Sequence, residues 1–176
     1  MNYSENFIKA KKACADIISQ SKNSIDYTHA ENTLEWLTKL YGAEDEILCL
    51  AAFAHDIERA MPNRLHPKEF LDYDEYKRQH SMRSGEIVSS IAEKCGFSKD
   101  ESSRLAKVIA GAEFTSTDPD IQKVCDADSI SFFDNNLDTY RKKHDEKGTK
   151  DKVDFMYGRA SLRAKKIIDG IIETSD

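Results

Sequence analysis

The chain has 176 residues, of which 39% are hydrophobic and 33% charged, and its formal net charge at pH 7 is −6. This length and apolar content predict a single domain, residues 1–176, with one core. Charges of both signs are interspersed and form no basic stripe, which argues against an obligatory nucleic acid polymer as a partner.

The ends and the cysteines of the chain indicate its surroundings. No apolar leader follows the first residues, and no stretch is long enough to span a membrane, so we expect a cytoplasmic protein without a membrane partner. The four cysteines are widely spaced and form no C-x-x-C pair. We therefore expect small buried hydrophobes rather than zinc ligands or disulfides.

Apolar residues recur at intervals of three and four, and only three prolines and seven glycines interrupt the pattern. This predicts an all-α fold, a compact domain of about six or seven helices. The first helix should run from about Ser4 to Ser19. Asp26 can cap a second helix, which Gly42 stops. A third helix should begin near Asp45 and carry His55.

Two prolines predict a loop or broken segment between Ala60 and Pro67. A long helix is expected from about Asp74 to Cys95. The S-x-x-E pattern of Ser98 and Glu101 has the form of a capping box that opens the next helix. Asp118 and Pro119 repeat a start signal, for a helix that continues to about Phe133.

The stretch from Asp134 to Lys152 is polar, charged and contains glycine, which predicts a mobile excursion. It contains His144, and it could form either a solvated loop or a lid over a site. One last helix is expected to carry Met156, Ala160, Ala164, Ile167 and Ile171.

His55 and Asp56 are adjacent at the end of an apolar helix. His55 follows Leu48 and Ala51 at helical intervals, so we expect it on the buried face. Burying an ionised aspartate is costly unless something compensates, and a divalent cation does so strongly. The alternative is a hydrogen-bonded core histidine beside an aspartate that ends the helix.

Asp128 lies on an apolar stripe with Ile121, Cys125 and Phe132, so its carboxylate needs a partner in the core. That partner is either a cation or an arginine in a buried salt bridge. Asp126 is rotated from Asp128 by about 160° on an ideal helix and is the poorer ligand. We expect Asp126 to be a solvated or supporting group.

His29 lies early in the second predicted helix, where a histidine alone is more often a helix-terminus residue than a ligand. Two imidazoles and two carboxylates, from His29, His55, Asp56 and Asp128, would give a mixed nitrogen and oxygen shell. Such a shell suits one divalent ion of Mn, Fe, Co, Ni, Zn or Mg, with positions left for water and substrate.

The order and spacing of His29, the His55-Asp56 pair and Asp128 resemble the HD-domain superfamily of metal-dependent phosphohydrolases, from about Tyr27 to Phe133. The resemblance implies that these four residues bind the metal ion. It also implies hydrolysis of a nucleotide or another small phosphate ester. Superfamily members act on nucleotides, cyclic nucleotides, alarmones and other phosphate esters, and the sequence does not choose among them.

The segment from His80 to Ile87 also looks like one that supplies a further histidine in dinuclear members. This chain departs from that pattern, because no histidine occurs between His80 and His144. We therefore expect one metal ion, with Glu113 available for a water or a weak second ion. His80 faces inward, either for substrate or proton-transfer contact or as a packed histidine.

The expected mechanism uses a metal-activated water. Asp56 would bind the ion and accept a proton from the water, and His80 would protonate the leaving oxygen. Arg59 and Arg83 are the candidates to bind the phosphate of a small phosphorylated substrate, the alternative being solvated surface charges. The rival functions are a ligand-binding or regulatory protein of reduced activity and a mononuclear iron oxygenase.

Overall fold

The computed structural model describes residues 3–175, and this part of the chain is all-helical and contains no strand. The α-helices are α1 (Glu5–Ile18), α2 (Ile25–Tyr41), α3 (Glu46–Ala54), α4 (Tyr73–Lys94), α5 (Lys99–Gly111), α6 (Pro119–Ser131), α7 (Leu137–Lys143), α8 (Glu146–Arg159) and α9 (Leu162–Ser175). Short 3-10 turns cover Ile57–Ala60 and Pro67–Glu69, and a π-turn covers Phe132–Asn136. None of the helices described is both long and apolar enough to cross a bilayer.

The start signals in the sequence mostly act as predicted. The hydroxyl of Ser98 accepts a hydrogen bond from the Glu101 amide, and the Glu101 carboxylate accepts one from the Ser98 amide. Asp118 likewise caps α6, with Pro119 in the first turn. The prediction for Asp26 is wrong: Ser24 is at the N-cap position, Asp26 lies inside the first turn of α2, and its carboxylate accepts hydrogen bonds from Ser21 and Asn23.

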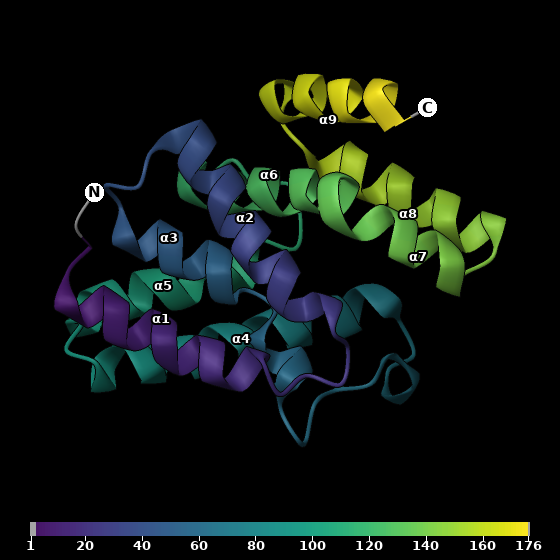
Figure 1. Cartoon of the computed structure of the whole chain (residues 1–176). Coiled ribbons are helices and arrows are strands. Elements are labelled where there is room, and N and C mark those ends of the chain that lie inside the picture. The colour runs from purple at the N-terminus through teal and green to yellow at the C-terminus, as the bar shows by residue number, and fades with distance from the viewer. Residues whose placement is uncertain (1–2, 176) are drawn as a thin grey trace.

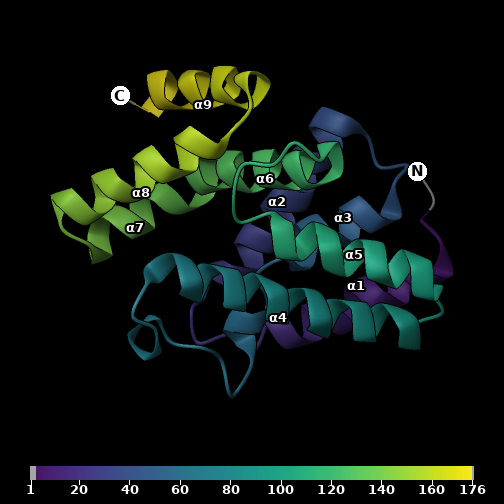
Figure 2. The ribbon, with the colours of Figure 1, turned by 180° about the vertical axis from the view of Figure 1, so that it is seen from behind.

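Helix α3 forms the centre of the bundle, and its residues 47–54 are all buried. It packs against α1, α2, α5 and α6 (Figure 1). Helices α4 and α5 lie side by side along one face (Figure 2), where a Cβ at Gly85 would come within 2.7 Å of the Ala106 carbonyl oxygen. The central position of α3 brings its carboxyl end into the interior, and His55 and Asp56 follow there.

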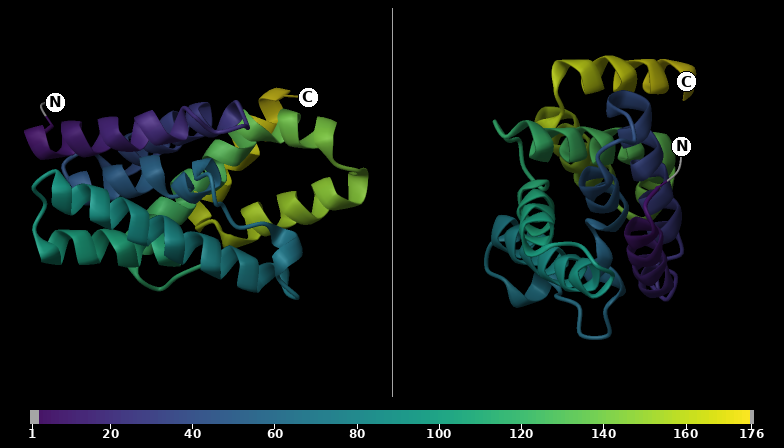
Figure 3. Two further views of the ribbon diagram at one scale, coloured as in Figure 1. Left: turned by 90° about the horizontal axis from the view of Figure 1, so that it is seen from below. Right: turned by 90° about the vertical axis from the view of Figure 1, so that its left-hand side faces the viewer.

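A second apolar cluster joins the π-turn to α8 and α9, and includes Phe132, Leu137, Met156 and Ile168. Trp36 packs against both this cluster and the main core. Figure 3 shows α7 and α8 as a hairpin that extends from one end of the bundle.

The prediction of a solvated loop at 134–152 is therefore wrong, because these residues belong to the π-turn, α7 and the start of α8. The stretch is polar because much of its surface faces solvent, while Leu137 is buried in the second cluster. The prediction of a single last helix is also wrong, because α8 ends at Arg159 and a separate helix, α9, begins at Leu162. These two differences account for more helices than the predicted six or seven.

Candidate metal centre

His55 directly follows the end of α3 and is buried. Its Nδ1 donates a hydrogen bond to the Ala52 carbonyl oxygen, at 2.9 Å. In the neutral imidazole this leaves Nε2 as a lone-pair acceptor. His55 Nε2 is buried and has no hydrogen-bond partner among the described residues. A buried nitrogen without a partner is rare in folded proteins, and a bound ion or water would account for it.

His29 reaches the same point from α2. Its Nδ1 lies 2.9 Å from the Ser131 hydroxyl, and that hydroxyl in turn donates to the His29 carbonyl oxygen. This network assigns the Nδ1–H of His29 to Ser131 and leaves Nε2 facing the interior. His29 Nε2 lies 3.0 Å from Asp128 Oδ1. Both histidines are thus held through Nδ1 with Nε2 directed at one place.

Asp128 extends from α6 between the two histidines. Its Oδ1 lies 3.4 Å from His55 Nε2, and its Oδ2 accepts a hydrogen bond from the Arg159 guanidinium. Burial alone would raise the pKa of Asp128, but Arg159 and the histidines outweigh burial and hold this pKa well below its usual range. Asp128 is therefore an ionised carboxylate. The sequence left an arginine salt bridge and a metal-ligand role as alternatives for Asp128. In the structure Oδ2 bonds to Arg159, and Oδ1 faces the two histidines.

Ligand atoms of His29, His55 and Asp128 lie within 4.8 Å of one another, so this cluster could hold a metal ion. The surroundings also favour positive charge. Burial would lower the pKa of His55, yet the carboxylates of Asp56 and Asp128 raise it to about 9. The same carboxylates that favour a proton on His55 would favour a bound cation.

Asp56, the fourth predicted ligand, flanks this cluster. Its Oδ2 lies 3.6 Å from His55 Nε2 and 4.0 Å from His29 Nε2. Arg59 donates to the same oxygen at 2.8 Å, and His80 Nε2 donates to Oδ1 at 2.8 Å. Asp56 is thus close to the three clustered ligands, with both of its oxygens already hydrogen-bonded.

His80 is buried between two carboxylates. Its Nε2 bonds to Asp56, and its Nδ1 bonds to Glu58 Oε2 at 2.9 Å. Burial would lower the pKa of His80, but these two hydrogen bonds raise it. His80 faces inward as expected, yet both ring nitrogens are engaged. This geometry favours a role in orienting Asp56 over protonation of a leaving group.

Arg83 does not reach the cavity. Its guanidinium donates to Glu58 Oε1 at 3.2 Å and to the Asn63 carbonyl oxygen at 2.7 Å. The prediction that Arg83 binds substrate is therefore not supported by its position. Glu58, which the sequence reading missed, is fully buried and connects Arg83 and His80. Helix periodicity did not predict that the Glu58 side chain points inward, because α3 ends before His55 and Glu58 lies in a 3-10 turn.

The cluster opens into a cavity of about 300 Å³. The predicted site residues that line it are His29, Asp56, Arg59, His80 and Asp128, and Glu113 joins them. The cavity is also lined by residues that the sequence reading did not assign to a site, among them Tyr73, Tyr76, Tyr140, Lys152 and Arg159. It is therefore a mixed site with acidic, basic and aromatic walls.

Arg159 is the most constrained of the missed residues. It is buried, and its Nε donates to the Ser129 hydroxyl at 3.0 Å. Its Nη1 donates to the carbonyl oxygens of Ala112 and Glu113, so the guanidinium that meets Asp128 is fixed on three sides. The sequence did contain a signal that Arg159 faces inward, because Arg159 follows Met156 at a helical interval on an apolar face.

Asp126 does not support the metal cluster directly, and it is not solvated as the sequence suggested. It is fully buried and faces the junction of α8 and α9. Its carboxylate accepts hydrogen bonds from the Ser161 amide and hydroxyl, from Tyr41 and from Gln122. Asp126 therefore anchors the turn that follows Arg159.

The fold and the cluster together define an all-helical protein with a buried histidine and aspartate group at the base of a cavity. A family model described as "Domain of unknown function (DUF4202)" matches residues 8–175. The chain belongs to this family. No curated protein and no solved structure matches it.

Proposed function

We propose that this protein is a metal-dependent phosphohydrolase of the HD type, acting on a nucleotide or another small phosphate ester. The observation that carries the proposal is the convergence of His29, His55 and Asp128, with a buried His55 nitrogen that has no hydrogen-bond partner within residues 3–175. The resemblance to the HD-domain superfamily, in the order and spacing of these residues and Asp56, supports the same conclusion.

The donor set fits a divalent cation. Each histidine has its Nδ1 engaged by the protein and offers Nε2, and Asp128 offers Oδ1. Asp56 is the fourth candidate ligand, through Oδ2. Nitrogen and carboxylate ligands of this kind suit one ion of Mn, Fe, Co, Ni, Zn or Mg. Glu113 lines the same cavity but is not part of the cluster.

A bound divalent cation supplies water of lowered pKa and polarises a phosphoryl oxygen. In our proposal Asp56 accepts the proton of the attacking water, and His80 holds Asp56 in orientation through its 2.8 Å hydrogen bond. Arg159 fixes Asp128 from the opposite oxygen. Arg59 lies beside Asp56 at the cavity and meets the phosphate oxygens.

The proposal also covers the size of the substrate, the partners of the protein and its location. The substrate is a small phosphorylated molecule that enters a cavity of about 300 Å³, at the lower end of the range for small-molecule sites. The excess of acidic over basic residues argues against a nucleic acid polymer as an obligatory partner. We propose a cytoplasmic enzyme that works without a membrane partner.

The test joins metal analysis to an assay of phosphate release from nucleotides and phosphomonoesters. We expect about one metal ion per chain in the unaltered protein, and a loss of metal and of hydrolysis together in His55→Ala and Asp128→Ala. His66→Gln is the matched control, because His66 is exposed and lies outside the cavity. Circular dichroism would verify that each variant is folded.

Full metal content in both site variants would contradict the proposed centre. Bound metal with no phosphate release across the panel would favour the ligand-binding or regulatory alternative. Oxygen consumption that depends on iron would favour the oxygenase alternative, since two histidines and carboxylates also suit a mononuclear iron.

A further inference from the structure

The cationic side chains that line the cavity differ in their partners. Four of them are paired within the protein: Arg59 with Asp56 at 2.8 Å, Lys77 with Asp74 at 2.8 Å, Lys143 with Asn23 at 3.3 Å, and Arg159 with Asp128. Lys152 also lines the cavity, but within residues 3–175 its ammonium has neither a hydrogen bond nor an ion pair. It is a cation available to a ligand.

Lys152 faces inward because of its position on α8. It precedes Met156 by one turn and Arg159 by two, and both of these residues are buried and line the same cavity. The Lys152 ammonium lies 5.4 Å from the centroid of the Phe155 ring and 5.7 Å from that of Phe132. The half-buried charge thus lies over two aromatic rings, which attract it weakly at these distances but supply no hydrogen bond and no opposite charge.

The charges that act on Lys152 belong to the candidate metal centre and its cavity. Glu113 and Asp128 attract the ammonium, whereas Arg59 and Arg159 repel it. Burial is the largest influence and lowers the pKa of Lys152 to about 8. Methionine in this place would fill similar space without that penalty. A lysine without an ion-pair partner at such a position is a candidate for a functional charge.

We propose that Lys152, together with Arg59, forms the subsite for the phosphoryl group of the substrate, beside the cluster of His29, His55 and Asp128. The identification of the anion as a phosphoryl group rests on the proposed function. The subsite itself rests on the unpaired ammonium, its inward position and the cavity that it lines. An entering oxyanion gives Lys152 the anionic partner that the described part of the chain does not supply, through a charge-assisted hydrogen bond.

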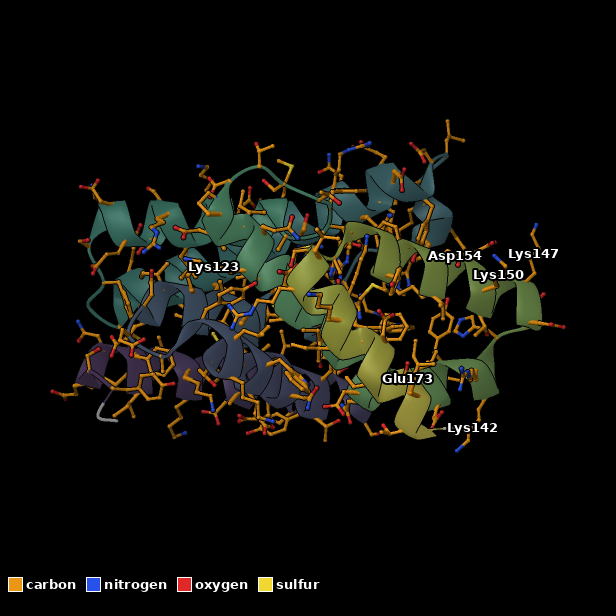
Figure 4. The ribbon with its side chains drawn as sticks, turned by 90° about the horizontal axis from the view of Figure 1, so that it is seen from above. Lys123, Lys142, Lys147, Lys150, Asp154 and Glu173 are labelled. Atoms are coloured by element: carbon orange, nitrogen blue, oxygen red, sulfur yellow. The ribbon has the colours of Figure 1, made fainter. Side chains whose placement is uncertain are left out.

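Inorganic phosphate is the probe, titrated calorimetrically into the chelator-treated full chain. We expect Lys152→Gln to weaken phosphate binding by about tenfold, the loss of one charge-assisted hydrogen bond. Lys152→Arg should retain most of the affinity. Lys150→Gln is the matched control: Figure 4 shows Lys150 directed outward on α8, where it pairs with Asp154 and is 72% exposed. The phosphate affinity of Lys150→Gln should match that of the unaltered chain.

A second measurement serves if Lys152→Gln folds poorly. Limited acylation of the unaltered chain near pH 8, read by peptide mass spectrometry, should label Lys152, and inorganic phosphate should protect it while leaving Lys150 exposed to the reagent. Equal labelling of Lys152 with and without phosphate would overturn the assignment. So would phosphate affinity that is unchanged in Lys152→Gln, or an unaltered chain that does not bind phosphate.

The two proposals can fail separately. Ester hydrolysis whose KM is unchanged in a folded Lys152→Gln variant would overturn the subsite and leave the proposed function standing. Phosphate binding that depends on Lys152, in a protein that hydrolyses no ester with any of the metals, would support the subsite and contradict the proposed function.

Discussion

Glu58 shows at the residue scale how several hydrogen bonds stabilise a buried charge. Glu58 is fully buried and accepts hydrogen bonds from the Leu65 amide, from His80 and from Arg83. These partners and the charge of His80 keep the pKa of Glu58 below its usual value in spite of burial. The histidine is held between two carboxylates, so the orientation of Asp56 depends on a network of ordinary hydrogen bonds.

Lys152 differs from Glu58 because no hydrogen bond from the described residues compensates for the burial of its charge. The free energy cost of this burial predicts that stability depends on pH. Burial lowers its pKa from 10.5 to about 8 in the folded protein. Protonation therefore destabilises the folded state increasingly as the pH falls from about 10.5 to 8. We expect Lys152→Met to raise the free energy of unfolding by about 1–2 kcal/mol at pH 7, less than the full shift because the side chain is partly accessible.

Urea unfolding at pH 7 and at pH 10.5 measures this effect. The gain in Lys152→Met should shrink as the pH rises, because at pH 10.5 the lysine is neutral in the folded state and half neutral in the unfolded state. Lys150→Met, at an exposed ion pair, should change the free energy of unfolding by less than about 0.5 kcal/mol at either pH. An equal gain at both pH values would show that improved packing, and not charge burial, is the cause.

At the scale of elements, α6 presents two aspartates in different directions. Asp128 faces α2 and the end of α3, where the two histidines lie, and Asp126 faces the start of α9. The Gln122 amide and the Thr115 hydroxyl both donate to the Arg159 carbonyl oxygen. Helix α6 therefore holds both Asp128 and the turn that supplies its arginine partner.

Asp126→Ala should lower the free energy of unfolding by about 3 kcal/mol, because it leaves partly buried donors of Tyr41, Gln122 and Ser161 without this acceptor. Urea unfolding gives the magnitude, and limited proteolysis should find new cleavage between α8 and α9. Asp100→Ala, at an exposed position in the first turn of α5, should cost only a few tenths of a kcal/mol. An Asp126→Ala variant as stable as this control would remove Asp126 from the role of anchor.

For the whole molecule, the candidate ligands join segments that are far apart in the chain. His29 comes from α2, His55 follows α3, and Asp128 comes from α6. A metal ion bound only by the folded state stabilises it by about 2.7 kcal/mol at a concentration 100 times its dissociation constant. Addition of the preferred metal to chelated protein should therefore raise the Tm by about 5–10 °C.

Differential scanning calorimetry checks this expectation without reference to any activity. The increase should be absent in His55→Ala and present in His66→Gln, which alters a histidine away from the cluster. An equal increase in all three proteins would indicate metal binding elsewhere on the surface.

Much of the fold could be predicted from the sequence because its signals are local. The all-helical class is confirmed, as are the capping box at Ser98 and the start of α6 at Asp118. The stretch from Asp134 to Lys152 could not be read in this way. Its helices are stabilised by a few apolar residues, such as Leu137, that pack into a cluster formed by distant segments.

For the candidate site, too, the local signals could be predicted from the sequence and the long-range contacts could not. The sequence by itself determined the all-helical class and the buried positions of His55 and Asp128, because helical periodicity is set by residues within two turns of each other. Only the tertiary structure decided that His29, His55 and Asp128 meet, that Arg83 lies outside the cavity, and that Lys152 and Arg159 line it. Those relations depend on the packing of helices separated by up to about a hundred residues, and no local pattern encodes such distances.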